Sequence, residues 1–293
     1  MRETTGLRDV PLQRLRDVVA DGDVLVLTGA GISTASGIPD YRGPTGALRA
    51  RLPMTYQAFR ADPAARQRYW ARSQLGWRSF RRAEPNTAHR CVGHLQAAGL
   101  LTGLLTQNVD GLHQAGGATD VVELHGNLDL VMCLGCLRRT SRRELDERLS
   151  AANPDWTAEA SLRVTQVNPD GDVLLDDEHV AGFRVVDCTE CEGILKPDVV
   201  FFGENVPPDK VAHCRSLVER CRSLLVLGSS LAVMSGLRFV RQAHGLGKPV
   251  VIVNQGWTRG DDLATHKVDA DLCAVLPPLT AGHLSPAGGP ASR

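Results

Sequence analysis

The segment VLVLTGAGIS, residues 24–33, joins a wholly apolar run to a glycine-rich turn. Four apolar residues without polar alternation are typical of a strand that is buried on both faces in a parallel sheet. Glycines allow the backbone to approach a phosphate closely, and a helix that starts after them offers free N–H groups. The motif alone leaves two interpretations open, a phosphate-binding loop or a tight turn in which Ser33 caps a helix.

Three further apolar runs share this design. Leu100–Leu105, Leu224–Leu227 and Val250–Val253 are followed by TQNVDGLH, GSSL and NQG, and helical stretches at Thr87–Ala98 and Asp209–Arg222 precede two of them. Alternating strands and helices predict an α/β fold with a doubly wound parallel sheet. Ligands of such sheets bind beyond the carboxyl ends of the strands, where this chain carries small and polar residues. A hydride-transfer dinucleotide site is disfavoured, because the turn is not G-x-G-x-x-G.

Composition bounds the function classes. The chain has 293 residues, 43% of them hydrophobic, and its 33 basic residues balance 33 acidic ones. These values exclude a disordered or fibrous chain and give no bulk attraction to nucleic acid. No apolar run reaches the roughly 18 residues that span a bilayer, and residues 1–23 lack an apolar signal core. We therefore expect a cytoplasmic protein that binds neither nucleic acid nor a membrane.

Two motifs carry reactive side chains. The run from Gln107 through Asn108 and Val109 to Asp110 offers amides and a carboxylate that suit ribose hydroxyls and a carboxamide, although Asn and Asp also cap helices. His125 follows a short strand and precedes a glycine, which favours a position in the cleft over one in the core. With an ordinary pKa near 6.5, a histidine there suits a general base, although a structural role is the alternative.

Four cysteines form two Cys-x-x-Cys pairs, Cys133 with Cys136 and Cys188 with Cys191. Two such pairs can surround Zn²⁺ tetrahedrally and close its coordination shell, as structural sites do. About fifty residues separate the pairs, more than a zinc ribbon usually has, so we expect the intervening segment to loop out.

These motifs, with SGIPDYR (36–42), ELHG (123–126) and LKPDVVFFGE (195–204), resemble the sirtuin family in this order, over about residues 21–277. RQRYWAR (66–72), LLVLGSSLAVMSG (224–236) and NQGWTRGDDLA (254–264) are most similar to its class II branch. The resemblance implies an inverted Rossmann-like domain at 1–45, 84–130 and 195–280. It also implies a small domain, with a helical module at 46–83 and a zinc-binding module at 131–194. We expect 281–293 to be a disordered tail and the protein to be a monomer.

The implied activity is NAD-dependent deacylation of protein lysine. The acyl-lysine oxygen attacks C1′ of the nicotinamide ribose as nicotinamide leaves, His125 acts as base, and the acyl group ends on ADP-ribose, while zinc is structural. Mono-ADP-ribosyl transfer with NAD is the alternative within enzymes. A non-catalytic NAD sensor or a nucleic-acid-binding zinc module is the alternative outside them, although the intact His125 and Asn108 argue against it.

The resemblance also implies site residues. His125 and Asn108 are catalytic, and NAD contacts fall on Gly29, Ala30, Gly31, Ser33, Asp40, Tyr41, Arg42, Gln107, Asn108, Val109, Asp110, Gly228, Ser229, Ser230, Asn254, Gln255, Gly256 and Leu272. The substrate peptide would pair with Val199, Phe202, Gly203 and Glu204. Tyr69 and Arg72 have the Tyr-x-x-Arg spacing of sirtuins that prefer acidic acyl groups. The alternative is a surface arginine beside a core tyrosine.

Overall fold

The structure is a computed structural model that describes residues 9–40, 54–156, 171–173, 175 and 177–280. Six strands form its larger sheet: β1 (Val24–Thr28), β2 (Leu101–Thr106), β3 (Val121–Glu123), β7 (Ser223–Leu227), β8 (Val250–Val253) and β9 (His266–Val268). They lie in the order β3-β2-β1-β7-β8-β9, and every neighbouring pair is parallel. The chain builds outward from β1 to one side and then, from β7, to the other. The strand order therefore reverses between β1 and β7, where ligands of open parallel sheets bind.

Helices cover both faces of this sheet because its central strands are apolar on both sides. In β1, Val24 and Val26 pack into one core cluster and Leu25 and Leu27 into another. The first cluster lies under α1 (Asp9–Ala20), α4 (Thr87–Ala97), α11 (Leu272–Val275) and α12 (Pro277–Thr280); the second lies under α9 (Pro208–Arg220) and α10 (Met234–Gly245). The predicted doubly wound parallel sheet is confirmed, and its predicted strands lie within one residue of the observed ones.

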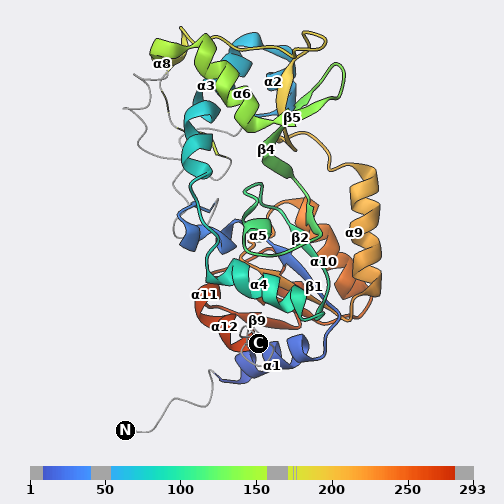
Figure 1. Cartoon of the computed structure of the whole chain (residues 1–293). Helices are drawn as coiled ribbons and strands as arrows, with labels where there is room; N and C mark the ends of the chain where they lie inside the picture. The colour runs from blue at the N-terminus through green and yellow to red at the C-terminus, as the bar shows by residue number, and fades with distance from the viewer. Residues whose placement is uncertain (1–8, 41–53, 157–170, 174, 176, 281–293) are drawn as a thin grey trace, which may run out of the picture.

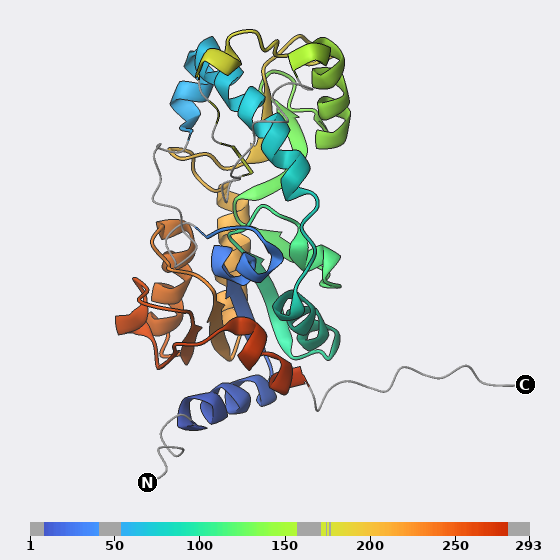
Figure 2. The ribbon, with the colours of Figure 1, turned by 90° about the vertical axis from the view of Figure 1, so that its left-hand side faces the viewer.

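A second lobe contains an antiparallel sheet. Its strands are β4 (Gly126–Cys133), β5 (Arg139–Ser141) and β6 (Leu195–Val199), in the order β5-β4-β6. Its helices are α2 (Tyr56–Ala61), α3 (Pro63–Phe80), α6 (Arg142–Ala152) and α8 (Asp177–Val180). Figures 1 and 2 both place this lobe at the end of the molecule away from α1. Strand β4 crosses the junction that we predict at 130/131, whereas β6 begins directly after the one at 194/195, and the domain boundaries stay predictions.

An aromatic cluster holds the second lobe together. Phe59, Tyr69, Trp70 and Phe201 pack with ring centroids 5.1–6.3 Å apart, and Phe59 and Trp70 are fully buried. These residues come from α2, α3 and the segment after β6, so their contacts join the helical module to the antiparallel sheet. Within the described residues, the helices all fall short of the length and apolarity that crossing a bilayer requires.

Candidate active site

A cavity of about 1100 Å³ opens beyond the carboxyl ends of β1, β2, β3, β7 and β8. Its floor comes from the polar residues that follow those strands, and its opposite wall includes Met54, Tyr69 and Val199 of the second lobe. Drug-sized ligands occupy cavities of about 300–1,000 Å³, so this one suits a large ligand or two ligands together. Of the predicted site residues, it is lined by Gly29, Ala30, Gly31, Ser33, Asp40, Tyr69, Gln107, Asn108, Val109, Asp110, His125, Val199, Phe202, Gly203, Glu204, Gly228, Ser229, Ser230, Asn254, Gln255 and Leu272.

Three glycines explain how the loops after β1 and β7 fit together at the point where the strand order reverses. A Cβ atom on Gly29 would lie 2.7 Å from the Cβ of Ser229, and one on Gly31 would lie 2.8 Å from the carbonyl oxygen of Gly228. Gly228 has a positive φ of 60°, which side chains disfavour. The glycines therefore let the two loops pack against each other at the edge of the cavity, which all three residues line.

Ser33 does not cap a helix. The chain after β1 forms two short 3₁₀ turns, η1 (Ala30–Ile32) and η2 (Thr34–Ser36), and the Ser33 side chain makes no capping bond to either. Its hydroxyl donates instead to Oδ2 of Asp110, 2.7 Å away, and Nδ2 of Asn108 donates to Ser33 Oγ at 3.0 Å. Burial raises the pKa of Asp110 above its ordinary value. A triad of Ser33, Asn108 and Asp110 thus lies at the exits of β1 and β2.

Two buried histidines lie beneath this triad. His89 Nδ1 accepts from the backbone of Asn86, and its Nε2 lies 3.4 Å from Ser33 Oγ. His113 Nε2 contacts Thr28 Oγ1 at 2.9 Å, and the two imidazole rings lie 5.0 Å apart. Burial lowers the pKa of His89 to about 4 and that of His113 to about 3. Both rings are therefore neutral at pH 7; His89 contacts the triad at Ser33, and His113 contacts Thr28 at the end of β1.

This pair predicts that acid destabilises the fold. In the unfolded chain both rings take up a proton as the pH falls through 6.5, whereas in the folded chain they stay neutral down to about pH 4. The unfolded state therefore binds more protons in this window, and the free energy of unfolding decreases as the pH is lowered from 6.5 to 4. Each unit of lowered pKa corresponds to about 1.4 kcal/mol. We expect His113→Gln to give a shallower fall of unfolding free energy between pH 6.5 and 4 in urea titrations, with His213→Gln, on an exposed residue of α9, as control. Equal slopes for wild type and His113→Gln would contradict the assignment.

His125 lies just after β3 with both ring nitrogens engaged. Nδ1 lies 2.7 Å from the carbonyl oxygen of Gln107, and Nε2 lies 2.8 Å from the hydroxyl oxygen of Ser235. A carbonyl oxygen only accepts, so Nδ1 carries the proton and the neutral ring has its lone pair on Nε2. Burial lowers the pKa of His125 below 6.5, which keeps the ring neutral at pH 7. The ring is half-buried and lines the cavity, so Nε2 is placed to accept a proton from a ligand.

Gln107 links His125 to the loop after β7. Its Oε1 accepts from the hydroxyl of Ser229 at 2.7 Å, and that hydroxyl oxygen accepts from the backbone of Leu231. Ser229 is 4% exposed, so its hydroxyl acts within the protein. One hydrogen-bonded network thereby joins the residues that follow β2, β3 and β7.

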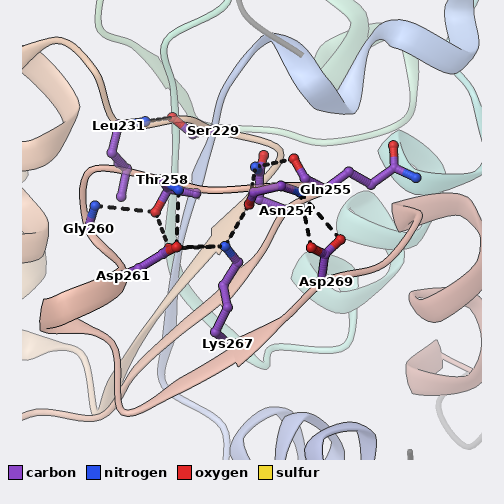
Figure 3. A network of polar contacts seen from close by, with 10 residues as sticks. Ser229, Leu231, Asn254, Gln255, Thr258, Gly260, Asp261, Lys267 and Asp269 are labelled. Atoms are coloured by element: carbon purple, nitrogen blue, oxygen red, sulfur yellow. Dashed lines mark hydrogen bonds and ion pairs between the residues drawn. The ribbon is translucent and has the colours of Figure 1, made fainter. Parts of the chain in front are cut away.

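The loop after β8 is held by charged side chains (Figure 3). Lys267 donates to the carbonyl oxygen of Gly256 at 2.8 Å and pairs with Asp261 at 3.0 Å, while the Asp269 carboxylate accepts from the Gly256 backbone. Asn254 and Gln255 line the cavity, whereas Gly256, which we predicted as an NAD contact, is not among its lining residues. Its φ of 78° indicates a turn role, because few side chains adopt that region.

The substrate-binding face that we predicted includes an open sheet edge. Among the described residues, β6 pairs with β4 on one side and with no strand on the other, and Val199 ends it at the cavity. Lys196, 2% exposed, pairs with Glu204 at 3.0 Å, and the Glu204 carboxylate accepts from the backbone of Phe201 at 2.7 Å. Glu204 therefore fixes the segment after β6, in which the Phe202 carbonyl oxygen also accepts from the backbone of Tyr56 at 2.9 Å.

Tyr69 and Arg72 differ in their access to the cavity. Tyr69 lines it, whereas Arg72 is not among the lining residues and its Nη2 donates to the carbonyl oxygen of Leu175 at 3.0 Å. Tyr41 and Arg42, which we predicted as NAD contacts, lie outside the described residues, as does the predicted tail at 281–293.

The four cysteines of the two Cys-x-x-Cys pairs converge. Their sulfur atoms all lie within 4.8 Å of one another, with 3.5 Å between Cys133 and Cys191 and 3.8 Å between Cys136 and Cys188. Zn–S bonds of about 2.3 Å in a tetrahedron place the sulfurs about 3.8 Å apart, so the cluster fits zinc. None of the four is among the described residues that line the cavity. Zinc held here has a closed shell and a structural role.

Sequence reasoning missed two lining residues of note. Ser235, in the first turn of α10, was not singled out, because a serine at a helix start carries no catalytic signature. Trp257 is 76% exposed yet lines the cavity. An exposed tryptophan is unusual, and its position straight after NQG was the available signal.

The comparisons with known proteins agree with this geometry. The model of the Sir2 family matches residues 29–235. NAD-dependent protein deacetylase 1 of Streptomyces coelicolor is 62% identical over 265 residues, which cover 90% of this chain and 87% of that protein. NAD-dependent protein deacetylase 3 of Pseudomonas syringae pv. tomato is 49% identical, over an alignment that covers 91% of this chain and 94% of that protein.

Solved structures show the same relationship. The structure titled Sir2-p53 peptide-NAD⁺ superimposes with a TM-score of 0.74 at 29% identity, covering 92% of this chain and 98% of that one. Sir2Tm bound to a propionylated peptide gives 0.72 at 28% identity, with the same coverage. The resemblance to the class II branch stays a prediction. The family match and the sequence identities place this chain in the Sir2 family, the sirtuins.

Proposed function

We propose that the protein is an NAD-dependent protein-lysine deacylase that transfers the acyl group to ADP-ribose and releases nicotinamide. The observation that carries the proposal is His125, which lines the cavity and whose Nδ1–H is fixed on the Gln107 carbonyl, so that Nε2 is the basic nitrogen of the ring. A neutral imidazole at the edge of a parallel sheet is suited to remove a proton from a sugar hydroxyl.

The residues beside His125 fit NAD. The glycine backbone at Gly29, Gly31 and Gly228 suits the pyrophosphate, and the triad of Ser33, Asn108 and Asp110 offers polar groups for ribose and carboxamide. The positions after β8 suit the adenosine end. NAD supplies an electrophilic ribose C1′ whose leaving group is nicotinamide.

The protein's part in the reaction is to position, shield and accept a proton. The residues of both lobes around the cavity hold the acyl-lysine oxygen toward C1′ and exclude bulk water, which would otherwise hydrolyse NAD. His125 Nε2 takes the proton of a ribose hydroxyl, whose oxygen bonds to the acyl carbon as that carbon's π bond to the lysine nitrogen breaks onto nitrogen. The open edge of β6 supports binding of the substrate peptide as an added strand.

The alternative, mono-ADP-ribosyl transfer, is not favoured, because the similar curated proteins are named deacetylases. A monomeric state, a cytoplasmic location and the absence of nucleic-acid binding stay predictions. Acyl-lysine peptides are the proposed partners.

A peptide panel tests the function. The protein is incubated with NAD and one peptide that carries acetyl-, propionyl- or glutaryl-lysine, and mass spectrometry quantifies the products. We expect deacylated peptide, nicotinamide and O-acyl-ADP-ribose in equal amounts with at least one acyl group, and none without NAD. NAD binding without product from any peptide would overturn the proposal, and label from NAD retained on unacylated protein would favour ADP-ribosyl transfer.

The preference for an acidic acyl chain is a finer proposal, which rests on the Tyr-x-x-Arg spacing and on Tyr69 at the cavity. If Arg72 pairs with an acyl carboxylate, Arg72→Met should lower kcat/KM for glutaryl-lysine by about tenfold more than for acetyl-lysine. Arg68→Met, on a half-buried arginine of α3 that pairs with Asp62, is the control. Equal losses on the two peptides would mean that Arg72 does not pair with the acyl carboxylate.

A further inference from the structure

Ser235 contacts the atom of His125 that we assign as the base. Ser235 lies in the first turn of α10, 110 positions away along the chain, and its Oγ is 2.8 Å from Nε2. Because the Gln107 carbonyl holds the proton on Nδ1, Nε2 of the neutral ring has only a lone pair, and the serine hydroxyl must be the donor. The hydroxyl thus completes the hydrogen bonds of the imidazole.

The start of α10 is built to reach this position. Gly236, the next residue, is buried, and a Cβ atom there would lie 2.8 Å from the side-chain amide of Gln107. Because Gly236 has no side chain, α10 can pack directly against Gln107, whose backbone carbonyl oxygen accepts from Nδ1 of His125. One glycine therefore brings Ser235 and Gln107 to opposite nitrogens of the same ring.

We propose that Ser235 is a positioning residue for His125 that serves Nε2 in both of its protonation states. In the ligand-free enzyme its hydroxyl donates to the lone pair and holds Nε2 at the cavity. A ribose hydroxyl then displaces this bond and gives its proton to Nε2, and its oxygen bonds to the acyl carbon as that carbon's π bond to the lysine nitrogen breaks and the electron pair moves to nitrogen. The new Nε2–H now donates to Ser235 Oγ, whose own proton turns away. A hydrogen bond from a charged donor is about twice as strong as a neutral one, so the serine favours the step that charges the ring.

The proposal rests on the proposed deacylase function, and it predicts a split between two steps. Exchange of labelled nicotinamide into NAD reports formation and reversal of the bond to C1′, which precede proton transfer to His125. Product formation requires that transfer. Ser235→Ala should lower kcat for O-acyl-ADP-ribose about ten- to a hundredfold, the loss expected for one hydrogen bond to a charged group. Nicotinamide exchange should stay within about twofold of wild type, and Ser235→Thr, which keeps the hydroxyl, should restore most of kcat.

Two further measurements complete the test. Ser216→Ala, on a half-buried serine of α9 whose hydroxyl bonds the His213 carbonyl, is the matched control and should leave both rates unchanged. In ligand-free protein with ¹⁵N-labelled histidine, NMR should show His125 with its proton on Nδ1, and Ser235→Ala should shift the Nε2 resonance. This readout needs no turnover, so failure of the deacylase proposal would appear separately, as a wild type without product. Parallel loss of exchange and product, no rescue by threonine, or an unmoved Nε2 resonance would overturn the role of Ser235.

Discussion

Replacing His125 by glutamine should lower the rate of O-acyl-ADP-ribose formation by about 10²- to 10⁴-fold, the usual contribution of a general base. Glutamine keeps a polar side chain of similar reach but has no basic nitrogen. Because the bond to C1′ forms before the base is needed, exchange of labelled nicotinamide into NAD should continue. Steady-state product formation and exchange, measured on the same preparation, separate the two steps.

The control for this prediction is His213→Gln, which changes an exposed histidine of α9 and should leave both rates intact. Product formation by His125→Gln within about twofold of wild type would remove His125 as the base. Loss of exchange together with product would instead mean that the ring is needed to bind NAD or the acyl-lysine.

Replacing Cys133 by alanine should unfold the second lobe and release its zinc. Structural zinc contributes an apparent 10–16 kcal/mol, roughly, to folding, which is comparable to the whole stability of a typical domain. Cys133 ends β4, and the neighbouring Leu134 donates to the carbonyl oxygen of Ile194 at 2.8 Å, just before β6. Loss of the metal should therefore disorder both strands and, with β6, the edge that we propose for the substrate peptide.

Three measurements check this outcome: zinc per chain by atomic emission, limited proteolysis between residues 133 and 195, and product formation. We expect zinc to fall from one per chain to none, rapid cleavage in that segment, and loss of turnover. Cys91→Ala changes a buried cysteine of the larger lobe and should keep its zinc. A Cys133→Ala protein that retains zinc and resists protease would show that the four sulfurs are not the metal site.

The sequence predicted the larger sheet well because local pattern determined it. Each residue of β1 is fully buried, so its apolar run marked a strand covered on both faces. The two cysteine pairs could be assigned to one metal site although Cys136 and Cys188 lie 52 positions apart, because two Cys-x-x-Cys pairs are typical ligands of a structural zinc ion. Polar residues follow four of the predicted strands, which indicated a site at one edge of the sheet, and the structure brings these residues to one cavity.

Contacts that depend on packing across the fold could not be predicted in this way. Ser235 reaches His125 only because α10 docks through Gly236, and no local pattern records that approach. Ser33 was expected either at a phosphate loop or as a helix cap, and its bond to Asp110 depends on how β1 and β2 lie side by side. Gly256 was carried over from the family pattern; it is not among the described residues that line the cavity, and its contact with NAD stays a prediction.

The central claim is that the imidazole of His125 lies beside the nicotinamide ribose of NAD at the carboxyl edge of the parallel sheet. A crystal structure of the protein with NAD and an acyl-lysine peptide tests it most directly. We predict a ribose hydroxyl within hydrogen-bond distance of Nε2, with the pyrophosphate against Gly29 and Gly31. NAD bound elsewhere, or a His125 ring turned away from the ribose, would contradict the account.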